Sequence, residues 1–210
     1  MKVLVFGASG ATGREVVKNA LGRGYSVRAF VRDPAKFEIR HANLDLMVGD
    51  VTDPAAVESA IKDSDAVASA LGSGNSLGSH PALSDGVQNI IQAMERIGVR
   101  RFVYLSMLGV GGSGKQLGFV DRYIVLPTLL RNVMRDHARE ERLIKHCTLA
   151  WVIVRPPRLT SGPYTGRYRS GENIRERTLL ASISRADVAD FMVAQLRDDG
   201  YVHGTPAVLG

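Results

Sequence analysis

The glycine spacing Gly7-Ala8-Ser9-Gly10-Ala11-Thr12-Gly13, directly behind the apolar run Lys2–Phe6, constrains the fold more than any other feature of the sequence. Glycines at this spacing allow a tight turn between a strand and a helix, and they let backbone approach a pyrophosphate closely. The start of the helix then faces the phosphates. The predicted dinucleotide-binding residues of this turn are Gly7, Ser9, Gly10, Ala11, Thr12 and Gly13. A purely structural turn is the alternative.

Short apolar runs alternate with helical patterns along most of the chain. The predicted strands are Lys2–Phe6, Ser26–Val31, Leu44–Val48, Ala66–Ala70, Arg101–Leu105 and Leu149–Val154. The predicted helices are Thr12–Gly22, Pro54–Asp63, Ala82–Ile97, Leu129–His146 and Arg185–Leu196. This alternation predicts an α/β fold with a doubly wound, mainly parallel sheet whose strands are buried on both faces.

The whole chain, residues 1–210, is predicted to form a single domain, since no linker or internal repeat interrupts it. The segment after Val154 is predicted to be a small C-terminal elaboration over the carboxyl ends of the strands, where ligands bind in open α/β sheets. No run of about 18 apolar residues occurs, which argues against a membrane span. One cysteine, Cys147, cannot form an internal disulfide, so a reducing compartment and a cytoplasmic location are expected.

Polar residues follow the predicted strands where a cofactor would lie. Arg32 comes directly after the second strand, where an arginine favours the 2′-phosphate of NADP; Asp33 beside it keeps NAD open. Asp50 and Val51 follow the third strand, and an adenine contact is expected there because Asp53-Pro54 already supplies the cap of the next helix. The fourth strand leads through Leu71 and Gly72 into a glycine- and serine-rich loop whose backbone donors suit a phosphate or ribose.

Positive charge is concentrated near the C-terminal third. The net charge is +6, and six arginines lie between positions 155 and 177, namely Arg155, Arg158, Arg167, Arg169, Arg175 and Arg177. Such a cluster attracts an anionic small molecule or a nucleic acid. A solvated hairpin with charged tips is the alternative.

Ser106 ends the fifth strand, where it is predicted to lie near the nicotinamide. Together with the glycine spacing, Val31-Arg32-Asp33, Gly49-Asp50-Val51 and Pro156-Pro157, this serine makes the chain resemble the atypical, NmrA-like short-chain dehydrogenase/reductases. Within them the resemblance is strongest to the biliverdin reductase B group of NADPH-dependent flavin reductases. It covers nearly the whole chain, including Tyr164-Thr165-Gly166.

The resemblance implies a single Rossmann-type domain, NADPH as hydride donor, and an aromatic, anionic acceptor such as a flavin or tetrapyrrole. It implies catalytic-site roles for Ser106 and for His137, and substrate contacts by Arg158 and Tyr164. Arg158 stands where the group has a second site histidine, a departure that weighs against biliverdin more than against flavin. By the residues alone, His137 fits the apolar stripe of its helix equally well.

No tyrosine of the sequence is followed four residues later by lysine. The Tyr-x-x-x-Lys pair lowers the tyrosine pKa for acid–base work on alcohols and ketones, so that chemistry is not expected. Three function classes remain: an NADPH-dependent reductase of flavin-like, quinone-like or tetrapyrrole acceptors; an NADP-sensing regulator of NmrA type; and a nucleic-acid binder, which rests on the arginine cluster alone and is not favoured. The histidines show no metal-ligand spacing, and no metal is expected.

Overall fold

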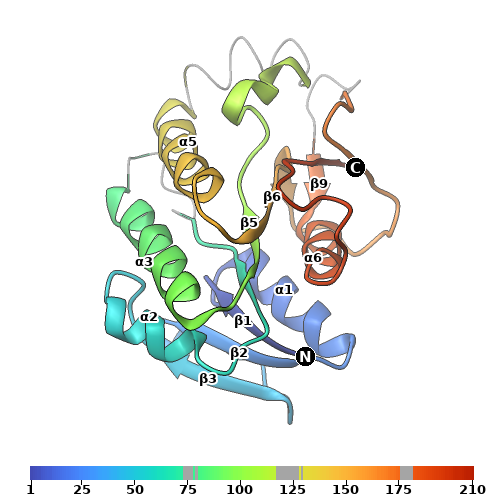
Figure 1. The fold of residues 1–210 in the computed structure, drawn as a ribbon. Coiled ribbons are helices and arrows are strands. Elements are labelled where there is room, and N and C mark those ends of the chain that lie inside the picture. Colours follow the sequence, from blue (N-terminus) through green and yellow to red (C-terminus); the bar gives the residue numbers. More distant parts are fainter. Residues whose placement is uncertain (73–77, 79, 117–127, 129, 176–181) are drawn as a thin grey trace.

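A six-stranded parallel sheet forms the centre of the protein in a computed structural model that describes residues 1–72, 78, 80–116, 128, 130–175 and 182–210 (Figure 1). Its strands are β1 (Lys2–Phe6), β2 (Ser26–Val31), β3 (Leu44–Val48), β4 (Ala66–Ser69), β5 (Arg101–Leu105) and β6 (Ala150–Val154). The strand order is β3-β2-β1-β4-β5-β6. This is the doubly wound Rossmann order, so the predicted fold class is confirmed.

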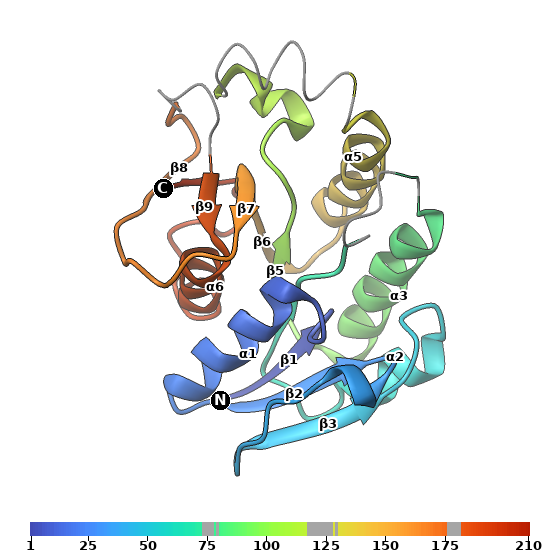
Figure 2. The ribbon, with the colours of Figure 1, turned by 180° about the vertical axis from the view of Figure 1, so that it is seen from behind.

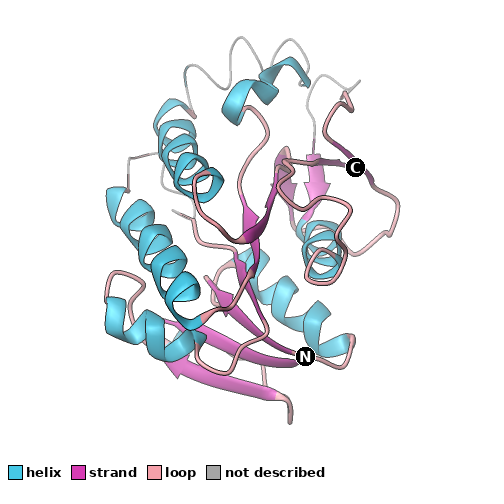
Figure 3. Ribbon diagram, viewed as in Figure 1, coloured by secondary structure: helices cyan, strands magenta, loops and turns pink. Residues whose placement is uncertain are grey.

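Helices cover both faces of the sheet (Figures 1 and 3). On one face lie α1 (Ala11–Gly22) and α6 (Arg185–Ala194), and on the other lie α2 (Pro54–Ile61), α3 (Pro81–Ile97) and α5 (Arg131–Lys145). Strand β1 divides its side chains between the two layers, because alternate residues point to opposite faces. Val3 and Val5 join the core under α1 and α6, whereas Leu4 and Phe6 join the core under α2 and α3.

The helix termini follow the local sequence. Asp53 caps α2 by accepting hydrogen bonds from the N–H groups of Ala55 and Ala56, with Pro54 in the first turn. Gly98 ends α3 in the left-handed conformation, at φ 89°. The Ser184 side chain caps α6 by accepting from the N–H of Asp187. The predicted cap at Asp53-Pro54 is confirmed, and at all three ends a residue type suited to the position satisfies backbone groups that a helix end leaves open.

Two expectations need correction. Strand β3 is not buried on both faces: it lies at the edge of the sheet, and Val48 is 54% exposed. The C-terminal third also does more than lie over the strand ends, because α6 packs lengthwise on α1 and completes one face. Two small sheets accompany it (Figure 2), which pair β7 (Arg158–Thr160) with β9 (Ser182–Ser184), and β8 (Arg169–Gly171) with β10 (Ala207–Leu209).

Polar contacts fasten α6 in this position. Asp190 of α6 accepts hydrogen bonds from Asn19 of α1 at 3.2 Å and from Arg23, the residue after α1, at 2.5 Å. Asp187 holds the preceding loop by accepting from the N–H groups of Thr165 and Gly166, both at 2.9 Å. Leu129, the predicted start of the helix Leu129–His146, and most of the glycine- and serine-rich loop after Gly72 lie outside the described residues.

Candidate functional site

The strand order reverses between β1 and β4, and the loops that leave these two strands meet. Gly7 follows β1 with φ +72°, and a Cβ placed on it would lie 2.5 Å from the carbonyl oxygen of Ala70, which follows β4. A Cβ on Gly13 would lie 2.1 Å from the carbonyl oxygen of Gly7. Both positions therefore require glycine, one for its backbone conformation and one for the close packing of α1 on the turn. The crevice at such a reversal is where doubly wound sheets bind ligands.

Helix α1 begins at this crevice without a side-chain cap. Gly10 is the N-cap residue and is exposed, and no side chain accepts from the first turn of the helix. The first backbone N–H groups of a helix have no partner within it, and they carry partial positive charge. A pyrophosphate fits this position, because Gly10 offers no side chain that would keep it from the backbone.

A cavity of about 490 Å³ extends from the glycine turn toward β2 and β3. Eight of the predicted cofactor-binding residues line it, namely Gly7, Ser9, Gly10, Arg32, Asp50, Val51, Leu71 and Gly72. The sequence did not single out its other lining residues, which are Phe30, Val31, Thr52, Ala70, Ala82 and Leu83. The apolar Phe30, Val31 and Leu83 give this end flat walls of the kind an adenine ring needs.

The charged residues at this end have separate tasks. Arg32 is exposed and lines the cavity. Asp33 instead caps the short 3₁₀ turn Pro34–Lys36 by accepting from the N–H of Ala35 at 3.0 Å, and it pairs with Lys36 at 3.2 Å. Asp50 accepts from the N–H and the hydroxyl of Thr52 at 2.9 Å and 2.7 Å. Those bonds, with the nearby positive charge of Arg32, hold the pKa of Asp50 below its usual range.

A second cavity of about 280 Å³ continues the groove on the other side of the glycine turn. It shares Gly10, Ala70, Leu71 and Gly72 with the first cavity, so the two form one groove. Its further lining residues are Ala11, Thr12, Leu105, Ser106, Met107, Val133, His137, Pro156, Pro157, Leu159 and Arg185. The structure thus brings Ser106 and His137 together at one end of the groove, and Gly13 packs beneath the turn.

Ser106 is tied to a buried ion pair. Its hydroxyl donates to Oε1 of Glu141 at 2.8 Å, and the Arg155 guanidinium donates to both oxygens of the same carboxylate, with Nε at 2.9 Å. Lys145 adds a contact to Oε2 at 3.0 Å. Burial alone would raise the pKa of Glu141, but Arg155, then Ser106 and Lys145, hold that pKa below its usual range.

His137 belongs to a second polar cluster. Its Nδ1 lies 3.0 Å from Oε2 of Glu140 and 3.1 Å from the phenol oxygen of Tyr104. The Tyr104 hydroxyl donates to Oε2 of Glu140. Burial, together with the charge of Glu140, raises the pKa of Tyr104 well above its usual value, so this phenol keeps its proton. His137 is therefore held by polar partners, which its alternative interpretation as part of an apolar helix stripe did not include.

The described arginines of the cluster between positions 155 and 177 do not line the groove. Arg155 is 5% exposed and paired with Glu141, so it cannot attract solutes from solution. Arg158 and Tyr164 are exposed and line neither cavity of the described structure, and Arg177 falls outside it. Arg185 lines the second cavity instead, because α6 begins beside the turn that follows β6. No sequence signal other than its place after the Ser184 cap could have indicated this.

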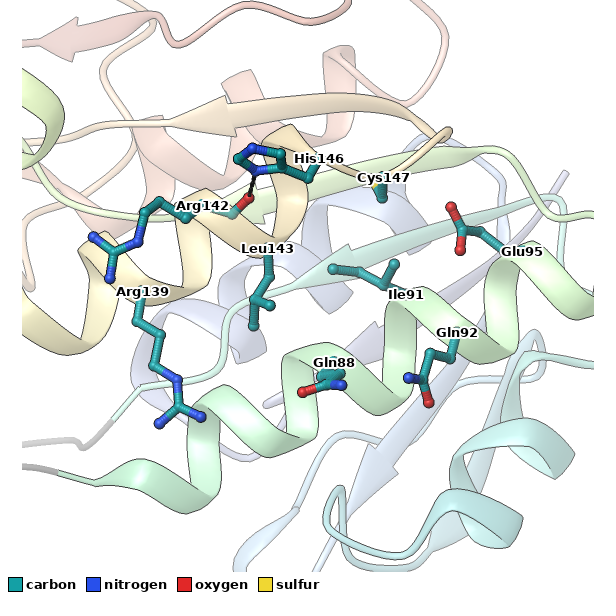
Figure 4. A pocket seen from close by; sticks show the side chains of 9 residues that line it. All are labelled: Gln88, Ile91, Gln92, Glu95, Arg139, Arg142, Leu143, His146 and Cys147. Atoms are coloured by element: carbon teal, nitrogen blue, oxygen red, sulfur yellow. Dashed lines mark hydrogen bonds between the residues drawn. The ribbon is translucent and has the colours of Figure 1, made fainter.

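A further hollow of about 350 Å³ lies between α3 and α5 (Figure 4). Its lining includes Gln88, Gln92, Arg139 and Arg142, long polar side chains on the outer surfaces of the two helices. It lies toward the C-terminal half of α3, away from the strand ends that carry the glycine turn. Within the described ranges, no group of three His, Cys, Asp or Glu side chains could hold a metal ion, and no helix is long and apolar enough to cross a membrane.

Comparison with known proteins agrees with this geometry. A family model described as NAD(P)H-binding matches residues 7–199. An uncharacterized chloroplastic protein of Arabidopsis thaliana is 32% identical over 204 residues, which cover 93% of this chain and 71% of that protein. Photosystem II assembly factor Ycf39 of Synechocystis sp. is 25% identical over 225 residues, which cover 100% of this chain and 63% of that protein. The chain therefore spans less than two thirds of the assembly factor.

Solved structures show the same fold. The oxidoreductase YlbE of Lactococcus lactis superposes with a TM-score of 0.83 at 21% identity, covering 99% of this chain and 90% of that one. A short-chain dehydrogenase/reductase of Veillonella parvula in complex with NADP gives 0.81 at 17% identity, with 99% and 93% covered. ChuY, an anaerobilin reductase of Escherichia coli O157:H7, gives 0.80 at 20% identity, with 99% and 96% covered.

Proposed function

Since the chain belongs to the NAD(P)H-binding family, we propose that it is an NADPH-dependent reductase that transfers hydride to a planar flavin-like, quinone-like or tetrapyrrole acceptor. The observation that carries the proposal is the single groove. Its glycine turn lies between a first cavity whose apolar residues suit an adenine ring and a second cavity with apolar walls. A nicotinamide cofactor bound in this groove supplies the hydride. The protein then acts by holding the two rings close together.

The preference for NADP over NAD rests on the end of β2. Arg32 lines the cavity, so it is placed to meet a 2′-phosphate. The Asp33 carboxylate, which would bind the ribose hydroxyls of NAD, is engaged by Ala35 and Lys36. The NADP named in the Veillonella parvula structure supports this assignment.

Ser106, His137 and Arg185 are the proposed acceptor contacts. Ser106 and His137 position the acceptor and are not asked for an obligatory proton, because an electron-poor ring takes hydride directly and the second proton comes from water. Arg185 gives the pocket its attraction for an anionic acceptor, a task that the sequence analysis gave to the arginine cluster between positions 155 and 177. The reductase activity named for ChuY supports a reductase of this fold.

The experiment is steady-state oxidation of NADPH with FMN, riboflavin or a small quinone, in the absence of added metal. We expect acceptor-dependent loss of NADPH absorbance. Ser106→Ala and His137→Ala should lower turnover only modestly, and Gln92→Ala, in the hollow between α3 and α5, serves as the control. A drop of about 10⁴-fold in either variant would mean that a true proton donor had been taken for a positioning group.

A second experiment separates the two arginines. FMN carries a phosphate that riboflavin lacks, so FMN should have the lower KM, and added salt should narrow the difference. Arg185→Ala should abolish the preference for FMN, because Arg185 lines the cavity. Arg158→Ala is the matched control and should keep the preference. The reverse pattern would restore Arg158 as the substrate contact.

An NADP-sensing regulator is the second candidate. The name of the assembly factor Ycf39 supports it, since that relative covers the whole of this chain and is described by its role in assembly. Tight NADPH binding without oxidation by any flavin or quinone would favour the sensor. The same titration would then report the cofactor affinity on which sensing depends.

A further inference from the structure

Two neighbouring glutamates of α5 lie behind the polar groups of the second cavity, which we name the acceptor pocket. Glu140 and Glu141 are each 2% exposed, although charged side chains are rarely buried. Glu141 binds Ser106, and Glu140 binds His137 and Tyr104. Ser106 and His137 line the pocket. Ser106 and His137 are therefore each held from behind by a carboxylate.

The contact with Glu141 fixes the direction of the Ser106 hydrogen bond. A hydroxyl has one proton, and an ionised carboxylate only accepts hydrogen bonds. Glu141 is charge-paired with Arg155, whose Nε lies 2.9 Å from the same Oε1 that Ser106 contacts at 2.8 Å. The Ser106 proton is thus committed to Glu141. What Ser106 offers the pocket is its oxygen, as an acceptor.

The contacts of His137 fix its tautomer in the same way. The Tyr104 hydroxyl gives its proton to Glu140, so its oxygen can accept a further bond. Nδ1 of His137 faces this oxygen at 3.1 Å and the Glu140 carboxylate at 3.0 Å, both of them acceptors. Nδ1 must therefore carry the proton. With the proton on Nδ1, Nε2 is an acceptor in the neutral form of the ring, and no hydrogen bond from another described residue to Nε2 is present.

We propose that Glu140 and Glu141 are positioning residues that set the hydrogen-bond polarity of the acceptor pocket, so that rings which present an N–H donor to Ser106 or His137 bind more tightly than rings which do not. Rings that offer only carbonyl oxygens place lone pair against lone pair and bind less tightly. The inference rests on the proposed function in one respect, that the acceptor ring lies in this pocket. Arg185, at the same pocket, donates only, so anionic groups of the ligand belong on its side.

The test is binding rather than turnover. Lumiflavin and N3-methyllumiflavin are titrated by fluorescence into the protein saturated with NADP⁺; they differ in one ring N–H, and neither carries a phosphate for Arg185. We expect wild-type protein to bind lumiflavin about 3- to 10-fold more tightly, the range of one neutral hydrogen bond. Ser106→Ala or His137→Phe should abolish the difference, and Ser106→Thr, which keeps the hydroxyl, should retain it.

Glu141→Gln tests the positioning role directly, because glutamine can donate to Ser106 and free its proton for the ligand. We expect the ratio between the two flavins to fall toward one while the NADP⁺ affinity is kept; the ratio compares two ligands on one variant, so loss of stability does not change it. Equal binding of both flavins by wild-type protein, no binding of either, or a ratio unchanged in both Ser106→Ala and His137→Phe would overturn the inference.

The outcomes also separate this inference from the proposed reductase. Preference for the N–H flavin without any NADPH oxidation would support the pocket polarity and overturn the reductase. Oxidation of NADPH with equal affinity for the two flavins would overturn the pocket polarity and support the reductase.

Discussion

The ion pair between Glu141 and Arg155 gives a prediction whose size follows from burial. Glu141→Gln leaves the Arg155 guanidinium, in a residue 5% exposed, without a counter-charge. Removing one partner of a buried pair costs about 3–5 kcal/mol. For a chain of 210 residues each kcal/mol lowers the melting temperature by about 2–4 °C, so the expected fall in Tm is about 6–20 °C.

Removing both charges should restore most of this loss. Glu141→Leu combined with Arg155→Met fills the site with apolar side chains of similar length, and such replacements are often neutral or stabilising. The double variant still buries the Ser106 hydroxyl without its acceptor, at a cost of about 1–3 kcal/mol. Adding Ser106→Ala removes that cost. Lys145 is exposed and can turn to water.

Thermal and urea unfolding at neutral pH check this order of stability: wild type close to the triple variant, then the double variant, then Glu141→Gln. Glu15→Gln is the control, since Glu15 pairs with the exposed Lys18 and such pairs contribute about 0–1 kcal/mol. The reasoning is refuted if Glu141→Gln unfolds within about 1 kcal/mol of wild type. It is equally refuted if the double variant is no more stable than the single one.

Two further predictions concern the groove and the C-terminal helix. Arg32→Ala should weaken NADPH by about 1.5–3 kcal/mol and NADH far less, because it removes a charge-assisted contact to the 2′-phosphate; binding titrations check this, and equal losses would reject the role of Arg32. Hydrogen bonds from Thr165, Ser184 and Gly166 overcome the effect of burial and hold the pKa of Asp187 below its usual range. At pH values above the ordinary pKa of aspartate, the ionised carboxylate therefore stabilises the fold. This stability is lost as the pH falls through the lowered pKa. Asp187→Asn should lower the free energy of unfolding at neutral pH, and the difference from wild type should shrink as the pH is lowered. The control Asp85→Asn changes an exposed carboxylate and should show no such pH-dependent difference. A difference that stays constant with pH in urea titrations would contradict this reasoning.

Much of the fold was predictable because it depends on local signals. The glycine spacing, the continuous apolar strands and the caps at Asp53 and Ser184 each act within a few residues of one another. The exposure of β3 was missed, since its place at the sheet edge depends on which strands pair. The packing of α6 on α1 was missed for the same reason, because Asp190 and Arg23 are far apart in the sequence.

The candidate site divides in the same way. Residues that follow a strand end, such as Arg32, Asp50 and Ser106, could be placed because parallel strands end at one edge. Glu140, Glu141 and Tyr104 gave no signal, since a glutamate on a charged helix is indistinguishable by sequence from a solvated one. Arg155 could not be recognised as a buried residue from the sequence, because its partner Glu141 comes from another element.

The position of helix α5 depends on directional hydrogen bonds and ion pairs more than on apolar packing. Only three of its residues are buried, and two of them, Glu140 and Glu141, are charged; Ile144 is the third. A shift of the helix by one residue would put an arginine, Arg142 or Arg139, in the place of one of the two glutamates and so break its cluster. An apolar helix face can tolerate a change of register, whereas two adjacent carboxylates with different partners cannot. The two glutamates therefore fix a single register of α5. That register also sets the direction of the side chains, such as His137, that α5 contributes to the groove.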